Sequence, residues 1–411
     1  MKQYLIFTIG CFLMLSVALK AQNLDVYLKE ASGNNPGLKA KYAEFEASVK
    51  RVSQVNALPD PTLSFGVFIS PIETRVGAQK AKISLSQMFP WFGTLKAKGN
   101  ASTFLAEAKY QEFLNAKNEL HFKVKKAYYP LFEIKQHILL KEAYLDILET
   151  DKQLAITAFA NNKASMTDVI RVGILIEDQQ TDIQLLKDQL RPYSIRFNRL
   201  LNKADTSEIV VSNTLNALVL KEKHQRDSVL VANPMLRSID SKIQASESMV
   251  LLAKKKGLPQ FGVGLDYAFI SKRTDMEIAN NGQDAIMPMV TMSLPLFRKK
   301  HNAAIAESEL LQTAMQFKKQ DLENALLTSY ENAQFEADKA LQLVSLYNKQ
   351  MQKTQQMVEL LYVDYSNSGK DFEEVLRMQQ QLLKYQIALI SSKVQYHIAL
   401  AQLDFITAKT E

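Results

Sequence analysis

The tetrapeptide NPGL at 35–38 returns as NPML at 233–236, and each copy opens a similar run of sequence. In both copies a proline, Pro61 or Pro259, follows the asparagine after 26 residues. A repeat this regular indicates two copies of one structural unit related by pseudo-symmetry. The duplication therefore decides the architecture before any single residue is considered.

A pair of strands follows each proline. The first strand of each pair is TLSFGVFI at 62–69 or QFGVGLDYAF at 260–269, where apolar residues alternate with small or polar ones. Strands of about nine to eleven residues with this alternation suit a membrane β-barrel, although a soluble sheet with one buried face shares the pattern. The sequence thus predicts β-hairpins over 62–89 and 260–294.

The first hairpin ends in QMFPWFG, with three aromatic residues close together. Aromatic side chains gather at the membrane–water boundary. We therefore expect Phe89, Trp91 and Phe92 to be membrane-interface anchors.

The rest of each copy is helical. Apolar residues recur every seven positions, which is typical of coiled-coil seams. The predicted short, long and returning helices cover 37–57, 95–160 and 167–201 in copy one, and 235–256, 299–366 and 372–406 in copy two. A short and a returning helix together approach the length of the long one. We therefore expect them to stack end to end beside it.

The first 21 residues resemble a secretory signal, because Lys2 precedes an apolar run from Tyr4 to Leu19 and the stretch ends in ALKA, with cleavage expected after Ala21. A retained transmembrane anchor is the alternative. Cys11 is the only cysteine of the chain. Apolar sequence continues after it, which argues against lipidation of this residue. The formal net charge is +7, but lysines and glutamates are interleaved, which argues against nucleic-acid binding.

The predicted organisation has four parts. These are a signal peptide over 1–21, a first repeat over 22–201, an equatorial strap over 202–232 and a second repeat over 233–411. The fold class is mainly α with a small β part. Four strands cannot close a barrel, and lipid tolerates no open sheet edge. A membrane location thus requires an oligomer, and three copies would supply twelve strands.

Catalytic and metal-binding motifs are missing from the sequence. It contains no GxSxG, P-loop or dinucleotide loop, and no histidine pair or acidic cluster with metal-site spacing. We predict no enzyme activity, no cofactor and no metal site. Met287, Met289 and Met292 could bind a soft metal, but strand packing is the favoured role.

Five short motifs carry a family resemblance that extends over essentially the whole mature chain: LPDPTLSFG, GLPQFGVG, QMFPWFGTLKAKG, MTDVIR and FEEVLR. In order, spacing and duplication they resemble the TolC-like outer membrane efflux family. The resemblance implies a homotrimer with a 12-stranded β-barrel in the outer membrane and an α-helical barrel across the periplasm. The FPWFG stretch looks most like the heavy-metal efflux branch of Bacteroidetes-like bacteria.

The resemblance also implies partners and a function. Family members dock to a periplasmic adaptor and an inner-membrane pump, usually of the resistance–nodulation–division class. The expected function is a passive exit duct of a tripartite efflux system for drugs or metals. A type I secretion duct is an alternative with the same fold. A non-channel periplasmic coiled-coil adaptor is the second alternative, but it leaves the two amphipathic hairpins unexplained.

Two turns, 160–167 and 365–372, correspond to the periplasmic tips of the family, which close the channel and engage the adaptor. The residues expected to form this gate and docking site are Asn162, Lys163, Ser165, Asp168, Arg171, Ser368, Gly369, Asp371, Glu373, Glu374 and Arg377.

Family channels often line the closed aperture with acids, and Glu374 occupies the matching position. Where a second acid is often found one turn on, this chain has Arg377, which puts a strongly acidic double ring in doubt. The alternative hypothesis is a neck of ion pairs between Glu374 or Glu373 and Arg377 or Arg171. Solvated turn charges without a role are the remaining possibility.

Two prolines are expected to bend helices at one level. Pro130 precedes the first turn by about the distance at which Pro192 follows it. Interior proline kinks a helix. We predict an equatorial bend there, with the strap wrapped around it; two unrelated local kinks are the alternative.

Overall fold

The computed structural model of the chain describes residues 24–215, 230, 232–368 and 372–408. The predicted signal peptide and much of the second half of the predicted strap lie outside the described residues. The chain divides into two compact units. Unit 1 comprises Met1–Lys39, Asn115–Asn233 and Asn324–Glu411, and unit 2 comprises Ala40–Leu114 and Pro234–Glu323.

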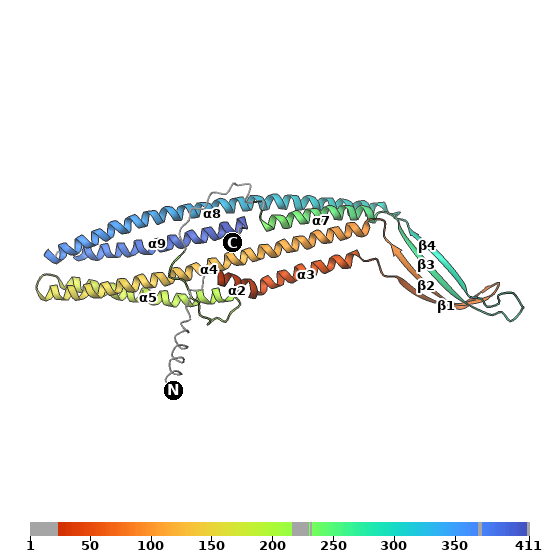
Figure 1. Cartoon of the computed structure of the whole chain (residues 1–411), viewed down its shortest axis with the longest axis horizontal. Coiled ribbons are helices and arrows are strands. Elements are labelled where there is room, and N and C mark those ends of the chain that lie inside the picture. Colours follow the sequence, from red (N-terminus) through yellow and green to blue (C-terminus); the bar gives the residue numbers. More distant parts are fainter. Residues whose placement is uncertain (1–23, 216–229, 231, 369–371, 409–411) are drawn as a thin grey trace, which may run out of the picture. The chain divides into compact units, whose positions relative to one another are not determined.

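The elements repeat in the predicted order, and Figure 1 labels them along the chain. They are α2 (Leu24–Asn34), α3 (Pro36–Asn56), β1 (Thr62–Thr74), β2 (Gly77–Phe89), α4 (Thr94–Ala160), α5 (Met166–Leu200), α7 (Pro234–Lys256), β3 (Gln260–Ser271), β4 (Ala285–Ser293), α8 (Arg298–Ser368) and α9 (Phe372–Thr407). The mainly α fold class with a small antiparallel sheet is confirmed. Helix α2 was not predicted.

Within unit 2, the four strands form one antiparallel sheet in the order β1-β2-β3-β4. One row across it contains Ser64, Ser84, Asp266 and Met287. The neighbouring row contains Leu63, Leu85, Leu265 and Pro288. Because successive residues of a strand point to opposite faces, the register separates a polar face from an apolar one.

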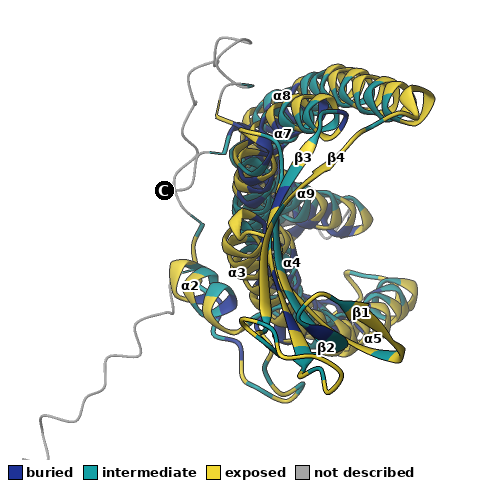
Figure 2. Ribbon diagram, turned by 90° about the vertical axis from the view of Figure 1, so that its right-hand side faces the viewer, coloured by how far each residue is buried: buried dark blue, intermediate teal, exposed yellow. Residues whose placement is uncertain are grey.

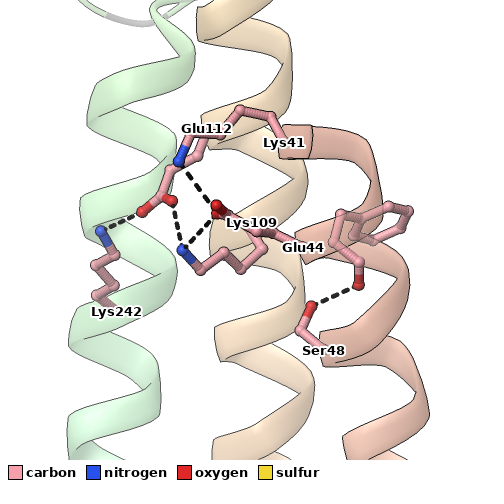
Figure 3. Close-up of polar contacts among 7 residues, drawn as sticks. Lys41, Glu44, Ser48, Lys109, Glu112 and Lys242 are labelled. Atoms are coloured by element: carbon pink, nitrogen blue, oxygen red, sulfur yellow. Dashed lines mark hydrogen bonds and ion pairs between the residues drawn. The ribbon is translucent and has the colours of Figure 1, made fainter. Parts of the chain in front are cut away.

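The helices of unit 2 are joined by a chain of ion pairs across α7, α4 and α3 (Figure 3). Glu112 on α4 lies 2.6 Å from Lys242 and 3.0 Å from Lys109, measured between nitrogen and oxygen. Lys109 is also 3.3 Å from Glu44, which pairs with Lys41. Burial alone would raise the pKa of Glu112, but hydrogen bonds from the two lysines lower it. The network therefore holds helices of both sequence copies together.

Unit 1 contains the coiled coils that lead to the two turns. Helix α4 contacts α5 through Lys141 Nζ and Asp182 Oδ2, 2.6 Å apart. Helix α4 also contacts α9, because Glu133 Oε1 accepts a hydrogen bond of 2.5 Å from Ser391 Oγ. Among the described residues, no helix contains a segment that is long and apolar enough to cross a membrane.

Both prolines lie inside continuous helices, Pro130 in α4 and Pro192 in α5. The described part of the strap contacts α4 beside Pro130, because the Ser212 amide donates to Tyr128 Oη at 3.0 Å. Tyr27 of α2 also holds this segment through its hydroxyl, which accepts from the Val210 amide at 2.9 Å. The equatorial bend itself stays a prediction.

Candidate functional site

The apolar face of the sheet is exposed along all four strands. Phe65 is 73% exposed, Val67 79% and Val290 83%. Figure 2 shows β1 and β4 almost wholly in the colour of exposed residues. Further exposed large apolar residues of this face include Leu63, Leu85, Phe89, Val263, Leu265, Tyr267, Phe269, Ile286 and Met292. An apolar surface of this extent is typical of a binding or membrane surface.

The opposite face carries a charged pair that sequence reasoning did not single out. Lys82 of β2 and Asp266 of β3 form an ion pair, and Asp266 is only 2% exposed. The two residues are diagonal neighbours, because Lys82 pairs with Ala268 and Ser84 with Asp266. Asp266 stood at a polar position of an alternating strand. Its partner became evident only from the register.

The three predicted anchors lie at the join between β2 and α4. The ring of Trp91 stacks on Phe261 with a centroid distance of 5.7 Å, and Phe92 is 79% exposed. Gly93 has φ +78°, which favours glycine. Lys255 of α7 donates a hydrogen bond to the Phe92 carbonyl at 3.1 Å. The loop thus presents Phe92 outward from a fixed backbone.

The first turn is a tight connection closed by a capping box. Asn162 has φ +56°, which this residue type tolerates better than most. Ser165 Oγ accepts from the Thr167 amide at 3.2 Å, and Asp168 accepts from the Ser165 amide at 3.2 Å. Lys163 donates its amide to Ala158 at 2.9 Å. Ser165 and Asp168 therefore shape the start of α5.

The second turn is described only at its flanks. Helix α8 ends at Ser368 and α9 begins at Phe372. Gly369 and Asp371 lie outside the described residues, as does the side chain of Ser368. Phe372 is buried, and its ring stacks on Tyr365 at 4.7 Å.

Ion pairs connect the predicted tip charges. Arg171 of α5 reaches Glu373 of α9 with a nitrogen–oxygen distance of 3.1 Å. Arg377 holds Glu374 through two hydrogen bonds of 2.8 Å and 2.5 Å. Those bonds hold the pKa of Glu374 below its ordinary value. The structure therefore brings together three ion pairs: one between the two turns, one within α9, and one within α5, where Arg171 lies 3.5 Å from Asp168.

Behind the turns lies a buried carboxylate that the sequence did not reveal as a site. Asp151 of α4 is 2% exposed. It accepts hydrogen bonds from Tyr362 of α8 at 2.7 Å and Gln379 of α9 at 2.9 Å. Burial raises the pKa of Asp151 above its ordinary value. Its only signal in the sequence was its place on the apolar face of α4, between Leu148 and Ala155.

The strand methionines do not share one face. Met287 pairs with Asp266 and Met289 with Gly264 on the polar face, whereas Met292 pairs with Phe261 on the apolar one. Among the residues that the structure describes, no three His, Cys, Asp or Glu side chains gather in a group that could hold a metal ion.

Comparison with known proteins agrees with this geometry. Residues 226–409 match the family model described as outer membrane efflux protein. A search of curated proteins found no match.

Solved structures match along nearly the whole chain. The outer membrane protein VceC from Vibrio cholerae is 14% identical, with a TM-score of 0.75 over 93% of this chain and 95% of its own. CusC is 15% identical, with a TM-score of 0.79 over 93% and 91%. The MtrE outer membrane channel of Neisseria gonorrhoeae is 17% identical, with a TM-score of 0.73 over 93% and 88%.

At identities this low, the TM-scores show that the fold is shared and nothing more. The family model matches the region that contains the second sequence copy. The chain therefore carries the outer membrane efflux protein family's region in residues 226–409 and, over 93% of its length, has the fold of the solved TolC-like outer-membrane channels.

Proposed function

We propose that the chain forms the outer-membrane exit duct of a tripartite efflux system, as a homotrimer that conducts substrates passively. The observation that carries this proposal is the four-stranded sheet with one exposed apolar face and one polar face. Such a sheet can meet lipid outside and water inside. Residues 1–21 would act as a signal peptide that directs export of the chain and is then cleaved.

The sheet also argues for an assembly. Within the described sheet, β1 and β4 are at the edges, each with one strand partner. In lipid their unpaired edge groups would cost several kcal/mol each, so the edges must meet other copies. Three copies give twelve strands, which agrees with the trimer that the family resemblance implies. Phe89, Trp91 and Phe92 would then lie at the membrane boundary.

The gate is proposed at the two turns. Arg171–Glu373 would hold the two tips in a closed arrangement, Arg377 would neutralise Glu374 within α9, and the same turns would meet a periplasmic adaptor. An inner-membrane pump of the resistance–nodulation–division class would supply the energy. The duct needs only shape, lining charge and a gate.

Expression of the full chain with its own first 21 residues tests this function. We expect the protein in the outer-membrane fraction, extractable only with detergent, as a trimer on gels that heating converts to monomer. A soluble periplasmic monomer would instead support the coiled-coil adaptor alternative. Co-purification with a resistance–nodulation–division pump rather than an ABC exporter would separate efflux from type I secretion.

A further inference from the structure

A cavity of about 610 Å³ lies within unit 1 among α4, α8 and α9. Of its sixteen described lining residues seven are aliphatic, among them Leu140, Leu154, Val358 and Leu383. This volume is in the range of pockets that hold drug-sized ligands, about 300–1,000 Å³. The cavity is therefore large enough for an organic molecule.

The charges that line the cavity have one sign. Asp146, Asp151 and Glu359 line it, and among the residues that the structure describes no Lys, Arg or His lines it. Asp151 is nearly fully buried, and its two hydrogen-bond donors, Tyr362 and Gln379, are neutral. A buried carboxylate without a cationic partner is costly, so a positive ligand would be favoured at this place.

Two further polar atoms in the cavity lining are unused. Tyr144 Oη and Gln379 Oε1 are buried and have no hydrogen-bond partner within the described part of the chain. Their residues are 7% and 4% exposed. Buried polar atoms are usually satisfied, so these two are available to hydrogen-bond a ligand.

We propose that this cavity is a binding site for an amphiphilic organic cation. The apolar body of the ligand packs against the leucine and valine walls, and its positive group lies beside Asp151. An N–H group of the ligand can donate to Gln379 Oε1. The site is complete within one chain, so it does not depend on the proposed function as a duct.

Tetraphenylphosphonium is a suitable probe, because tetraphenylborate has nearly the same shape and the opposite charge. Binding of both ions to the full-length protein in an uncharged detergent is measured by isothermal titration calorimetry. We expect the cation to bind at least about tenfold more tightly than the anion, because charge discrimination in a partly buried site is strong. Equal binding of the two ions would overturn the proposal.

Three variants locate the site. Asp151→Asn keeps the shape and removes the buried charge, and it should weaken cation binding about tenfold. Glu359→Gln removes an exposed lining charge and should weaken it about threefold. Glu149→Gln is the matched control, because Glu149 is on α4 but does not line the cavity.

The variants distinguish this site from binding elsewhere. If Asp151→Asn does not fold, the exposed Glu359→Gln decides alone. Cation affinity that is unchanged in every lining variant that folds, or that falls equally in Glu149→Gln, would contradict the proposal.

Discussion

Asn233 Nδ2 donates a hydrogen bond to the backbone carbonyl of Ile406, 2.9 Å away. Its counterpart in the first copy, Asn35, donates to Leu200 at 3.0 Å. The last carbonyls of a helix have no partner within the helix, so each asparagine satisfies one at the end of a returning helix. Asn35 also accepts from the Leu38 amide at 3.1 Å, which caps the start of α3. The NP motif thus joins two helix ends in the first copy, and in the second copy Asn233 satisfies a carbonyl at the end of α9.

Asn35→Ala and Asn233→Ala should each lower the free energy of unfolding by about 1–2 kcal/mol, because each removes the partner of a helix-end carbonyl and Asn35→Ala also removes the cap of α3. Chemical unfolding of the purified protein measures the change. Asn161→Ala is the control: its Nδ2 donates to the Thr157 carbonyl at an exposed place. If all three variants have equal stability, the NP asparagines have no special role.

Arg171→Gln and Glu373→Gln should each increase the open fraction of the channel about twofold, since an exposed ion pair contributes about 0.2–1 kcal/mol. Planar-bilayer conductance measures this fraction at low salt, where screening is weak. The exchange Arg171→Glu with Glu373→Arg should restore closure, and Arg191→Gln on the same helix serves as the control. No rescue by the exchange would show that the pair does not hold the gate.

Asp151 should make stability decrease as the pH rises. Burial raises its pKa, so the folded protein binds the proton more tightly than the unfolded chain. The contribution is therefore largest below the ordinary Asp pKa of about 3.9 and is lost as the pH rises through the folded-state pKa. Neutral Tyr144, Tyr362 and Gln379 surround the carboxyl.

The difference in unfolding free energy between the wild type and Asp151→Asn isolates this carboxyl from the others. We expect wild-type stability relative to the variant to fall from about pH 4 upward. A difference that is constant with pH, or that rises, would contradict a raised pKa.

Neighbouring residues of β1 should respond oppositely to a charge. Phe65→Lys places an ammonium on the apolar face, where lysine at mid-membrane costs about 2–4 kcal/mol. Ser64→Lys places the same group on the polar face and should be tolerated. The amount of heat-sensitive trimer in outer membranes measures both, and similar loss in the two variants would exclude lipid contact by the Phe65 face.

The sequence allowed prediction of features that repeat locally. The strand alternation placed Phe65 and Val67 together on one face, and the NP motifs located the starts of α3 and α7. Long-range contacts could not be predicted in this way. The buried Asp151 is hydrogen-bonded to Tyr362 and Gln379, which are 211 and 228 positions away in the sequence.

Helix α2 was missed for the same reason. It is short, and the burial of Tyr27 depends on the rings of Tyr128 and Phe197, both distant in sequence. At the turns, the sequence predicted that charged side chains would be present but left their partners open. Only the structure paired Arg171 with Glu373.

Disulfide cross-linking can detect whether the sheet edges β1 and β4 close against those of other copies. Cys11 is the only native cysteine and lies in the predicted signal peptide, so introduced cysteines would be the only ones in the mature chain. Ser64→Cys in β1 is combined in turn with Met287→Cys, Met289→Cys and Thr291→Cys in β4, all on the polar face. In at least one register, oxidation in the outer membrane should give covalent dimers and trimers and nothing larger. Only monomers in every register, or a ladder beyond the trimer, would contradict a trimeric barrel.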